Sequence, residues 1–227
     1  MLKQVLEKYR YYKTKRQLPK NDIKLIIKKY LGNSPNILEA GAHVGFDTAQ
    51  FAMLFPKGKI YAFEPVPEIY NALEKNTSEF SNVFRYQQAL SDKNGYMSIN
   101  VSKGGVNGAS SLLKPKKHTD LFPEITFNET VKVATVCLDN WAKQESIQKI
   151  DFMWLDMQGY EITALKEGEN ILKTTKMVFT EVNLEELYEG CPLKTEVIEY
   201  MKTQGFEVMK EFFEESEAYG DILFRKK

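Results

Sequence analysis

The order of elements along the 227-residue chain predicts an α/β fold built on a mostly parallel, doubly wound sheet. Within residues 36–90, three short apolar segments alternate with two segments of helical spacing, which is the β-α-β-α-β order of such a sheet. The alternation resumes within residues 151–204. Residues 206–213 and 218–224 then predict an antiparallel pair that closes the sheet.

A helical preface comes before the alternating elements. Residues 2–16 carry apolar side chains at helical spacing among lysines, and residues 23–30 follow Asn21 and Asp22, which offer an N-cap candidate. The segment GNSP after them contains two helix breakers, so we assign 1–35 to an N-terminal helical extension and 36–227 to the main domain. In that domain we expect strands at 36–40, 59–63 and 83–90 and helices at 46–55 and 67–76.

Residues 95–140 interrupt the alternation and are expected to form a β-hairpin and loop insert in this domain. The turn signal at 92–95 (DKNG) leads into a predicted strand at 96–101, and a second strand is expected at 130–138. The segments between these strands are rich in Gly, Ser, Asn and Pro and are predicted as loops. After the insert we expect strands at 151–155 and 177–182 and helices at 162–172 and 195–204.

The composition is that of an ordinary globular protein. Hydrophobic residues make up 43% and charged residues 27%, which excludes a disordered or collagen-like chain. Lys plus Arg and Asp plus Glu are equal at 31 each, and this balance argues against a nucleic-acid partner. Residues 1–30 are nevertheless basic. Such a basic segment is typical of a solvated face, and the acidic last fifth of the chain could attract it. It is also typical of an arm that binds an anionic membrane or a glycan.

Cysteine usage and hydropathy bear on the cellular setting. Cys137 and Cys191 have no Cys or His neighbour at the spacing of a metal site, so no structural metal is expected. No apolar run approaches the roughly 20 residues of a membrane helix. The first residues have no apolar signal-peptide core either. We therefore expect a cytoplasmic protein without a transmembrane segment, and its oligomeric state stays open.

The first candidate site is the glycine-rich turn 41–45 (GAHVG), between a predicted strand and a predicted helix. Gly41 allows a sharp turn, Gly45 allows the helix to pack closely against the sheet, and the helix N-terminus offers free N–H groups to a ligand. His43 replaces the middle glycine that admits a pyrophosphate in dinucleotide-binding folds. A ligand without a diphosphate, such as S-adenosylmethionine, fits better, although a plain structural turn has the same spacing.

Acidic and polar residues end the next strands, at the carboxyl edge where ligands of open α/β sheets bind. Glu64 follows the second strand and is placed to accept both ribose hydroxyls of an adenosine. Residues 88–91 would then border the adenine. Asp156 and Glu181 follow later strands and should face the same crevice. Their oxygens could hold Mg²⁺ or Ca²⁺, orient a sugar or link loops, and a divalent metal is not favoured.

Five segments together resemble the FkbM family of class I S-adenosylmethionine-dependent methyltransferases. They are 38–48 (LEAGAHVGFDT), 61–65 (YAFEP), 89–92 (ALSD), 110–112 (SSL) and 151–161 (DFMWLDMQGYE). The resemblance covers residues 36–227 and implies a Rossmann-like, seven-stranded, mostly parallel sheet with helices on both faces. It also implies methyl transfer from S-adenosylmethionine to a hydroxyl, often on a sugar or a polyketide.

Most of the residues that we expect at the site lie in these segments. The cofactor-binding residues are expected to be Glu39, Gly41, Ala42, His43, Gly45, Thr48, Glu64, Pro65, Ala89, Leu90, Ser91 and Asp156. The acceptor-binding residues are expected to be Asn107, Ser110, Ser111, Gln158 and Asn183. The family commonly has Lys in place of Trp154 and Glu in place of Gln158, so no precise acceptor can be carried over.

O-methylation needs a base, because an alcohol is a poor nucleophile at neutral pH. Asp156 is the first candidate, and His43 and Glu181 are the others. His118 lies in a polar loop and is expected to be solvent-exposed, and Trp154 is expected to be buried on its strand. Two other functions share the architecture. One is a methyltransferase-like module that binds without turnover. The other is a nicotinamide-dependent oxidoreductase, against which the missing middle glycine argues.

Overall fold

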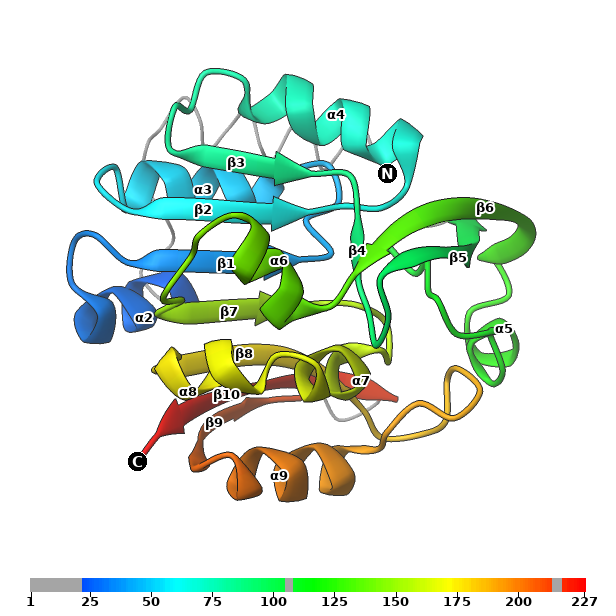
Figure 1. Ribbon diagram of the computed structural model, residues 1–227. Coiled ribbons are helices and arrows are strands. Elements are labelled where there is room, and N and C mark those ends of the chain that lie inside the picture. Colours follow the sequence, from blue (N-terminus) through cyan, green and yellow to red (C-terminus); the bar gives the residue numbers. More distant parts are fainter. Residues whose placement is uncertain (1–21, 105–107, 214–217) are drawn as a thin grey trace.

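Two β-sheets form the framework of the protein, for which a computed structural model describes residues 22–104, 108–213 and 218–227. The larger sheet has seven strands in the order β3-β2-β1-β7-β8-β10-β9, and the smaller sheet has three in the order β4-β6-β5 (Figure 1). The seven-stranded, mostly parallel sheet is therefore confirmed. The predicted helix at 2–16 and the candidate Asn107 lie outside the described residues.

The parallel strands at the centre of the large sheet are almost wholly apolar because the sheet is buried on both faces, as parallel sheets generally are. The parallel strands are β1 (Asn36–Ala40), β2 (Lys59–Phe63), β3 (Val83–Tyr86), β7 (Phe152–Leu155) and β8 (Met177–Asn183). The chain ends in β9 (Phe206–Phe212) and β10 (Tyr219–Lys226), and β10 runs antiparallel to both β8 and β9. The predicted antiparallel pair is thus correct.

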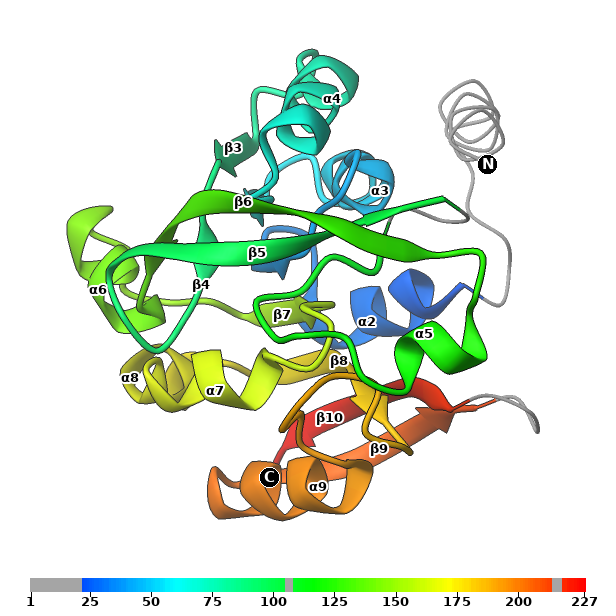
Figure 2. The ribbon, with the colours of Figure 1, turned by 90° about the vertical axis from the view of Figure 1, so that its right-hand side faces the viewer.

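Helices cover both faces of this sheet (Figure 2). One face carries α2 (Ile23–Leu31) and α3 (Phe46–Leu54), and α4 (Pro67–Thr77) packs beside α3. The other carries α6 (Leu138–Gln144), α7 (Glu161–Lys166), α8 (Glu169–Thr174) and α9 (Lys194–Thr203). The Asp22 side chain accepts a hydrogen bond from the backbone N–H of Lys24 at 2.8 Å, so Asp22 is the N-cap of α2. No helix among the described residues is long and apolar enough to cross a membrane.

A hairpin lies across the carboxyl ends of the parallel strands (Figure 2). It consists of β5 (Gly95–Lys103) and β6 (Thr126–Val136), which pair antiparallel, and β4 (Ala89–Leu90) pairs with β6. The segment that connects the two hairpin strands contains a short helix, α5 (His118–Leu121). The hairpin therefore forms a second layer over the edge of the sheet where the candidate site residues were expected.

Two predicted elements differ from the structure, and two short helices were missed. The strand expected at 83–90 is two strands, because its last residues leave the large sheet to pair with β6. The helix expected at 162–172 is divided into α7 and α8 at Gly168, where an added Cβ would overlap the Leu138 side chain. The short helices α5 and α6 were not predicted. His118 is 5% exposed, not solvated, because the aromatic rings of Phe122, Phe127 and Tyr188 surround it.

Candidate active site

The turn after β1 packs directly against the backbone of the loop after β7. Gly41 has φ 84°, and a Cβ there would overlap the carbonyl oxygen of Asp156. The Asp156 N–H donates to the carbonyl of Ala40 at 2.9 Å, which joins the same two loops. Gly45 has φ 82°, and a Cβ there would lie 2.7 Å from the Leu73 side chain. The second glycine thus admits α4, and not the sheet as we expected.

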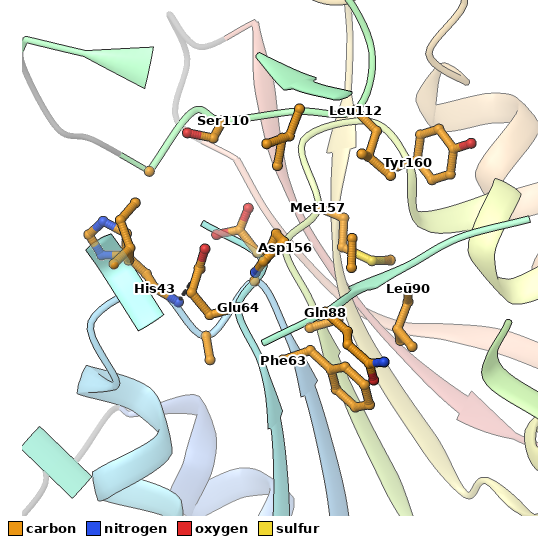
Figure 3. Close-up of a pocket in the computed structure, with 18 of the residues that line it drawn as sticks. His43, Phe63, Glu64, Gln88, Leu90, Ser110, Leu112, Asp156, Met157 and Tyr160 are labelled. Atoms are coloured by element: carbon orange, nitrogen blue, oxygen red, sulfur yellow. Dashed lines mark hydrogen bonds between the residues drawn. The ribbon is translucent and has the colours of Figure 1, made fainter. Parts of the chain in front are cut away.

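Glu64 follows β2 and connects the first two loops of the site. Its Oε2 accepts from the backbone N–H of His43 at 3.0 Å, and its Oε1 accepts from that of Val66 at 2.9 Å (Figure 3). Burial raises the pKa of this carboxyl to about 7, although the two N–H donors act in the opposite direction. Each oxygen still has a lone pair for a further donor, such as a hydroxyl.

Asp156 follows β7 and faces the same cavity as Glu64 (Figure 3). Its Oδ1 accepts from the side-chain amide of Gln158 at 2.6 Å. Burial raises the pKa of Asp156 to about 6, and the negative charge of Asp47 adds to the rise. A carboxyl with this pKa is mostly ionised at neutral pH and can accept a proton there.

The Gln158 side chain connects the carboxyl groups of Asp156 and Glu181. Its Nε2 lies 3.2 Å from both carboxylate oxygens of Glu181, and its Oε1 accepts from the Tyr188 hydroxyl at 2.8 Å. Gln158 itself has φ 55°, a conformation that few residues other than glycine adopt. Burial and the charge of Asp156 raise the pKa of Glu181 well above its ordinary value. The amide therefore orients two carboxyls that repel each other when both are ionised.

Glu161 supports the loop that carries Asp156 and Gln158. It is 2% exposed and is the first residue of α7. Its Oε1 accepts from the backbone N–H of Met157 at 2.7 Å and from that of Gly159 at 3.3 Å. Its carboxylate thus stabilises the loop that leads into the helix.

These loops enclose a cavity of about 270 Å³ at the carboxyl edge of the large sheet (Figure 3). The hairpin side is closed by Ile99, Ser110 and Leu112. Of the residues expected at the site, those that line the cavity are Gly41, Ala42, His43, Glu64, Pro65, Gln88, Ala89, Leu90, Ser110 and Asp156. This set comes from the loops after β1, β2 and β7, from β4 with the residue before it, and from the segment between β5 and β6, so the fold brings together residues far apart in the sequence.

The other expected residues lie behind the lining. They are Glu39, Gly45, Thr48, Ser91, Ser111, Gln158, Glu181 and Asn183. The Thr48 hydroxyl donates to the buried Glu39 carboxyl at 2.6 Å. The Ser111 hydroxyl is buried and donates to the backbone carbonyl of Gln158 at 2.8 Å. The Asn183 side chain is buried too, so Ser111 and Asn183 influence a ligand only through the groups that they contact, whereas Gln158 and Glu181 are partly exposed.

Several lining residues were not predicted. They are Ala40, Phe46, Asp47, Phe63, Ile69, Ile99, Gly108, Leu112, Met157 and Tyr160. Asp47 directly follows the glycine-rich turn, so its position in the first turn of the helix was a usable signal. Ile99 comes from the hairpin, and no local pattern indicates its contact with the cavity. Trp154 lines the cavity and is only half-buried, with its ring 4.2 Å from that of Phe179.

The charge of the cavity is negative. Among the described residues that line it, the charged side chains are Asp47, Glu64 and Asp156, and none is Lys or Arg. Behind them, burial and the charge of Asp47 raise the pKa of Glu39 to about 8. No group of three or more Asp, Glu, His or Cys side chains is arranged to hold a metal ion in the described part of the chain.

The buried carboxyls make stability depend on pH. The pKa values of Glu39, Glu64 and Glu161 are raised from 4.5 to about 8, 7 and 7, so the folded state binds more protons than the unfolded chain in this range. The free energy of unfolding should therefore fall by about 1 kcal/mol or more as pH rises from about 5 to about 8. Urea unfolding of the ligand-free protein at several pH values in this range measures the change in the free energy of unfolding.

Glu39→Gln should remove part of this pH dependence, because the amide does not ionise. Glu199→Gln, at an exposed position on α9, serves as the control and should leave it unchanged. A free energy of unfolding that is flat or rises over this pH range would contradict the assignment of raised pKa values to the buried carboxyls.

The architecture and the site define a class of protein. The fold is that of the class I S-adenosylmethionine-dependent methyltransferases, and one such solved structure is Aeropyrum pernix fibrillarin with natively bound S-adenosyl-L-methionine. The two superpose with a TM-score of 0.51 at 11% sequence identity, over 88% of this chain and 74% of the other. At this identity the likeness concerns the fold alone.

Sequence comparison gives the family. The profile of the Methyltransferase FkbM domain matches residues 39–208, and the chain belongs to this methyltransferase family. It is 30% identical over 197 residues to the 2-O-methyltransferase NoeI of Sinorhizobium fredii, covering 84% of this chain and 79% of that protein. It is 21% identical over 158 residues to the hexuronic acid methyltransferase AglP of Haloferax volcanii, covering 66% and 61% respectively. The resemblance inferred from the motifs is thereby confirmed.

Proposed function

We propose that this chain transfers a methyl group from S-adenosylmethionine to a hydroxyl of a sugar or glycan, with Asp156 as the base. The observation that carries the proposal is the position of the Asp156 carboxyl, which lines the same cavity as Gly41 and Glu64 and has a pKa raised to about 6. The sugar is supported by the names of the relatives NoeI and AglP, a 2-O-methyltransferase and a hexuronic acid methyltransferase.

The residues of the cavity fit this cofactor. The free lone pairs of Glu64 suit the two ribose hydroxyls, and Phe63, Ala89 and Leu90 offer apolar contact to an adenine. The carboxylates at the other end favour a sulfonium cation. A pyrophosphate would meet negative charge and, among the described lining residues, no Lys or Arg. This charge pattern supports S-adenosylmethionine over a nicotinamide dinucleotide.

The chemistry needs alignment and removal of a proton. The bound cofactor supplies an activated methyl group, and positioning of the acceptor hydroxyl contributes much of the acceleration. Asp156 takes the hydroxyl proton, while Gln158 holds its Oδ1 in place. His43 also lines the cavity and is the second candidate. Glu181 lies behind the lining and acts on Asp156 through the shared Gln158 amide.

The acceptor should enter on the side of the hairpin. Ser110 lines the cavity there, and its hydroxyl accepts from the backbone N–H of Ser102 at 3.0 Å, which fixes its position. We propose that Ser110 contacts the acceptor directly. Asn107 keeps its predicted role, and Ser111, Gln158 and Asn183 would support the acceptor side from behind.

Calorimetric titration with S-adenosylhomocysteine, paired with NAD, tests the cofactor. Binding of the first and not the second is expected, and the reverse would favour the oxidoreductase. Turnover is then measured as S-adenosylhomocysteine release with neutral sugars, amino sugars and hexuronic acids as acceptors. Cofactor binding without turnover on any acceptor would leave the non-catalytic binding module as the better explanation.

Replacement of Glu64 tests the ribose contact. Glu64→Ala should weaken S-adenosylhomocysteine binding at least about tenfold, because hydrogen bonds to a buried charged group contribute about 1.5–3 kcal/mol. Turnover at saturating cofactor should change little. Glu64→Gln keeps the size of the side chain and one of its two acceptor oxygens, so it should weaken binding less than Glu64→Ala does. Glu68→Ala at an exposed position nearby is the control. An unchanged affinity would refute the ribose assignment.

A further inference from the structure

A buried lysine of the N-terminal helix lies beside the cavity. Lys24 is on α2, ahead of residues 39–208 that the family profile matches. The helix packs Ile27 and Leu31 into the core beside Phe51 of α3. Lys24 is 4% exposed, whereas lysine is almost never buried unless it is paired. Its burial beside a ligand cavity therefore needs an explanation.

The contacts of its ammonium group give one. Nζ lies 2.6 Å from Oδ1 of Asp47 and 4.6 Å from the ring centroid of Trp154, with the Phe51 ring at 5.3 Å. Asp22 is 3.9 Å away. Both Asp47 and Trp154 line the cavity, whereas Lys24 does not. The lysine thus stands behind two residues of the cavity wall and holds them by an ion pair and a cation–π contact.

The position of Lys24 also makes it a counter-charge. Asp47 raises the pKa of both Glu39 and Asp156, and Lys24 opposes this rise at Glu39. Without Lys24, less positive charge would offset the negative charges of Glu39, Asp47 and Asp156 in and behind this wall of the cavity. Removing one partner of a buried ion pair is costly because it leaves the other charge unpaired.

We propose that Lys24 is a positioning residue of the methyl-donor site, which makes α2 part of the active site. It fixes the Asp47 carboxylate and the Trp154 ring, and it offsets part of the negative charge that faces the sulfonium. This inference rests on the proposed function, because it assumes that the cavity holds S-adenosylmethionine. It has a specific consequence. Lys24 sets how strongly the site prefers S-adenosylmethionine, which carries the sulfonium charge, to S-adenosylhomocysteine, which lacks it.

The affinity ratio of S-adenosylmethionine to S-adenosylhomocysteine measures this preference. The two ligands differ by a methyl group and the sulfonium charge, so packing defects affect both alike and largely cancel in the ratio. Lys24→Met should weaken both ligands and shift the ratio toward S-adenosylmethionine by roughly three- to tenfold, from loss of one nearby positive charge. Asp47→Asn should shift it the other way. The double variant should return the ratio close to that of the wild type.

Lys29→Met is the matched control, because Lys29 is an exposed lysine of the same helix. An unchanged ratio in Lys24→Met would overturn the inference. If Lys24→Met does not fold, Asp47→Asn and the double variant measure the same coupling, and equal ratios in those two would overturn it as well. Failure of the wild type to bind either ligand would instead refute the proposed function, so the two outcomes are distinguishable.

Discussion

At saturating cofactor and acceptor, Asp156→Asn is expected to lower turnover at least about 100-fold, the usual scale of lost general-base catalysis. The asparagine keeps the size of the side chain but cannot take the hydroxyl proton. The affinity for S-adenosylhomocysteine should stay within about tenfold of the wild-type value. Only the charge of the Asp156 side chain is removed, and the Gly41 turn is intact. Single-turnover measurements with saturating ligands, beside calorimetry, provide both values.

The pH profile separates a base from a structural carboxyl. Wild-type turnover should rise with pH through about 6, because the protonated Asp156 cannot accept a proton and the ionised one can. Asp156→Asn should lose this rise. Asp120→Asn, at an exposed position on α5, is the control. If Glu181→Gln or His43→Asn causes the larger loss and removes the rise, that residue is the base instead.

The sequence predicted the large sheet because each of its elements carries a local signal. The parallel strands are short apolar runs, and the helices between them show helical spacing or follow a cap. The β9–β10 pair was predicted for the same reason. The small sheet was predicted only in part, because the pairing of Ala89 with Thr135 joins residues far apart in the sequence. No local pattern indicates where a strand leaves one sheet for another.

The candidate site shows the same division. Gly41, Glu64 and Asp156 directly follow strands, and their position in the sequence is enough to bring them to one edge of the sheet. Ile99 and Leu112 reach the cavity only because the hairpin folds over that edge. Lys24 was grouped with the basic charges of the first thirty residues, since nothing in the sequence distinguishes a buried lysine from a solvated one.

Gly41→Ala should be the most damaging of the small substitutions. Alanine at φ 84° is strained, and its Cβ would overlap the Asp156 carbonyl oxygen, which is backbone and cannot rotate away. We expect a loss of about 3 kcal/mol or more, equivalent to a fall in melting temperature of roughly 6–12 °C for a chain of this size. S-adenosylhomocysteine binding should also be lost, because the β1 turn, whose His43 N–H holds Glu64, is forced away from the β7 loop, which carries Asp156.

Gly190→Ala separates the two causes. Gly190 has φ 71°, and a Cβ there would meet nothing within 4 Å, so this variant bears the cost of backbone strain without overlap. Its loss should be about 1 kcal/mol, with ligand affinity unchanged. The difference between the two variants then measures the close approach of the β1 and β7 loops. If Gly41→Ala costs no more than Gly190→Ala and still binds ligand, that approach is not needed for the site, and Asp156 must be held by its other contacts.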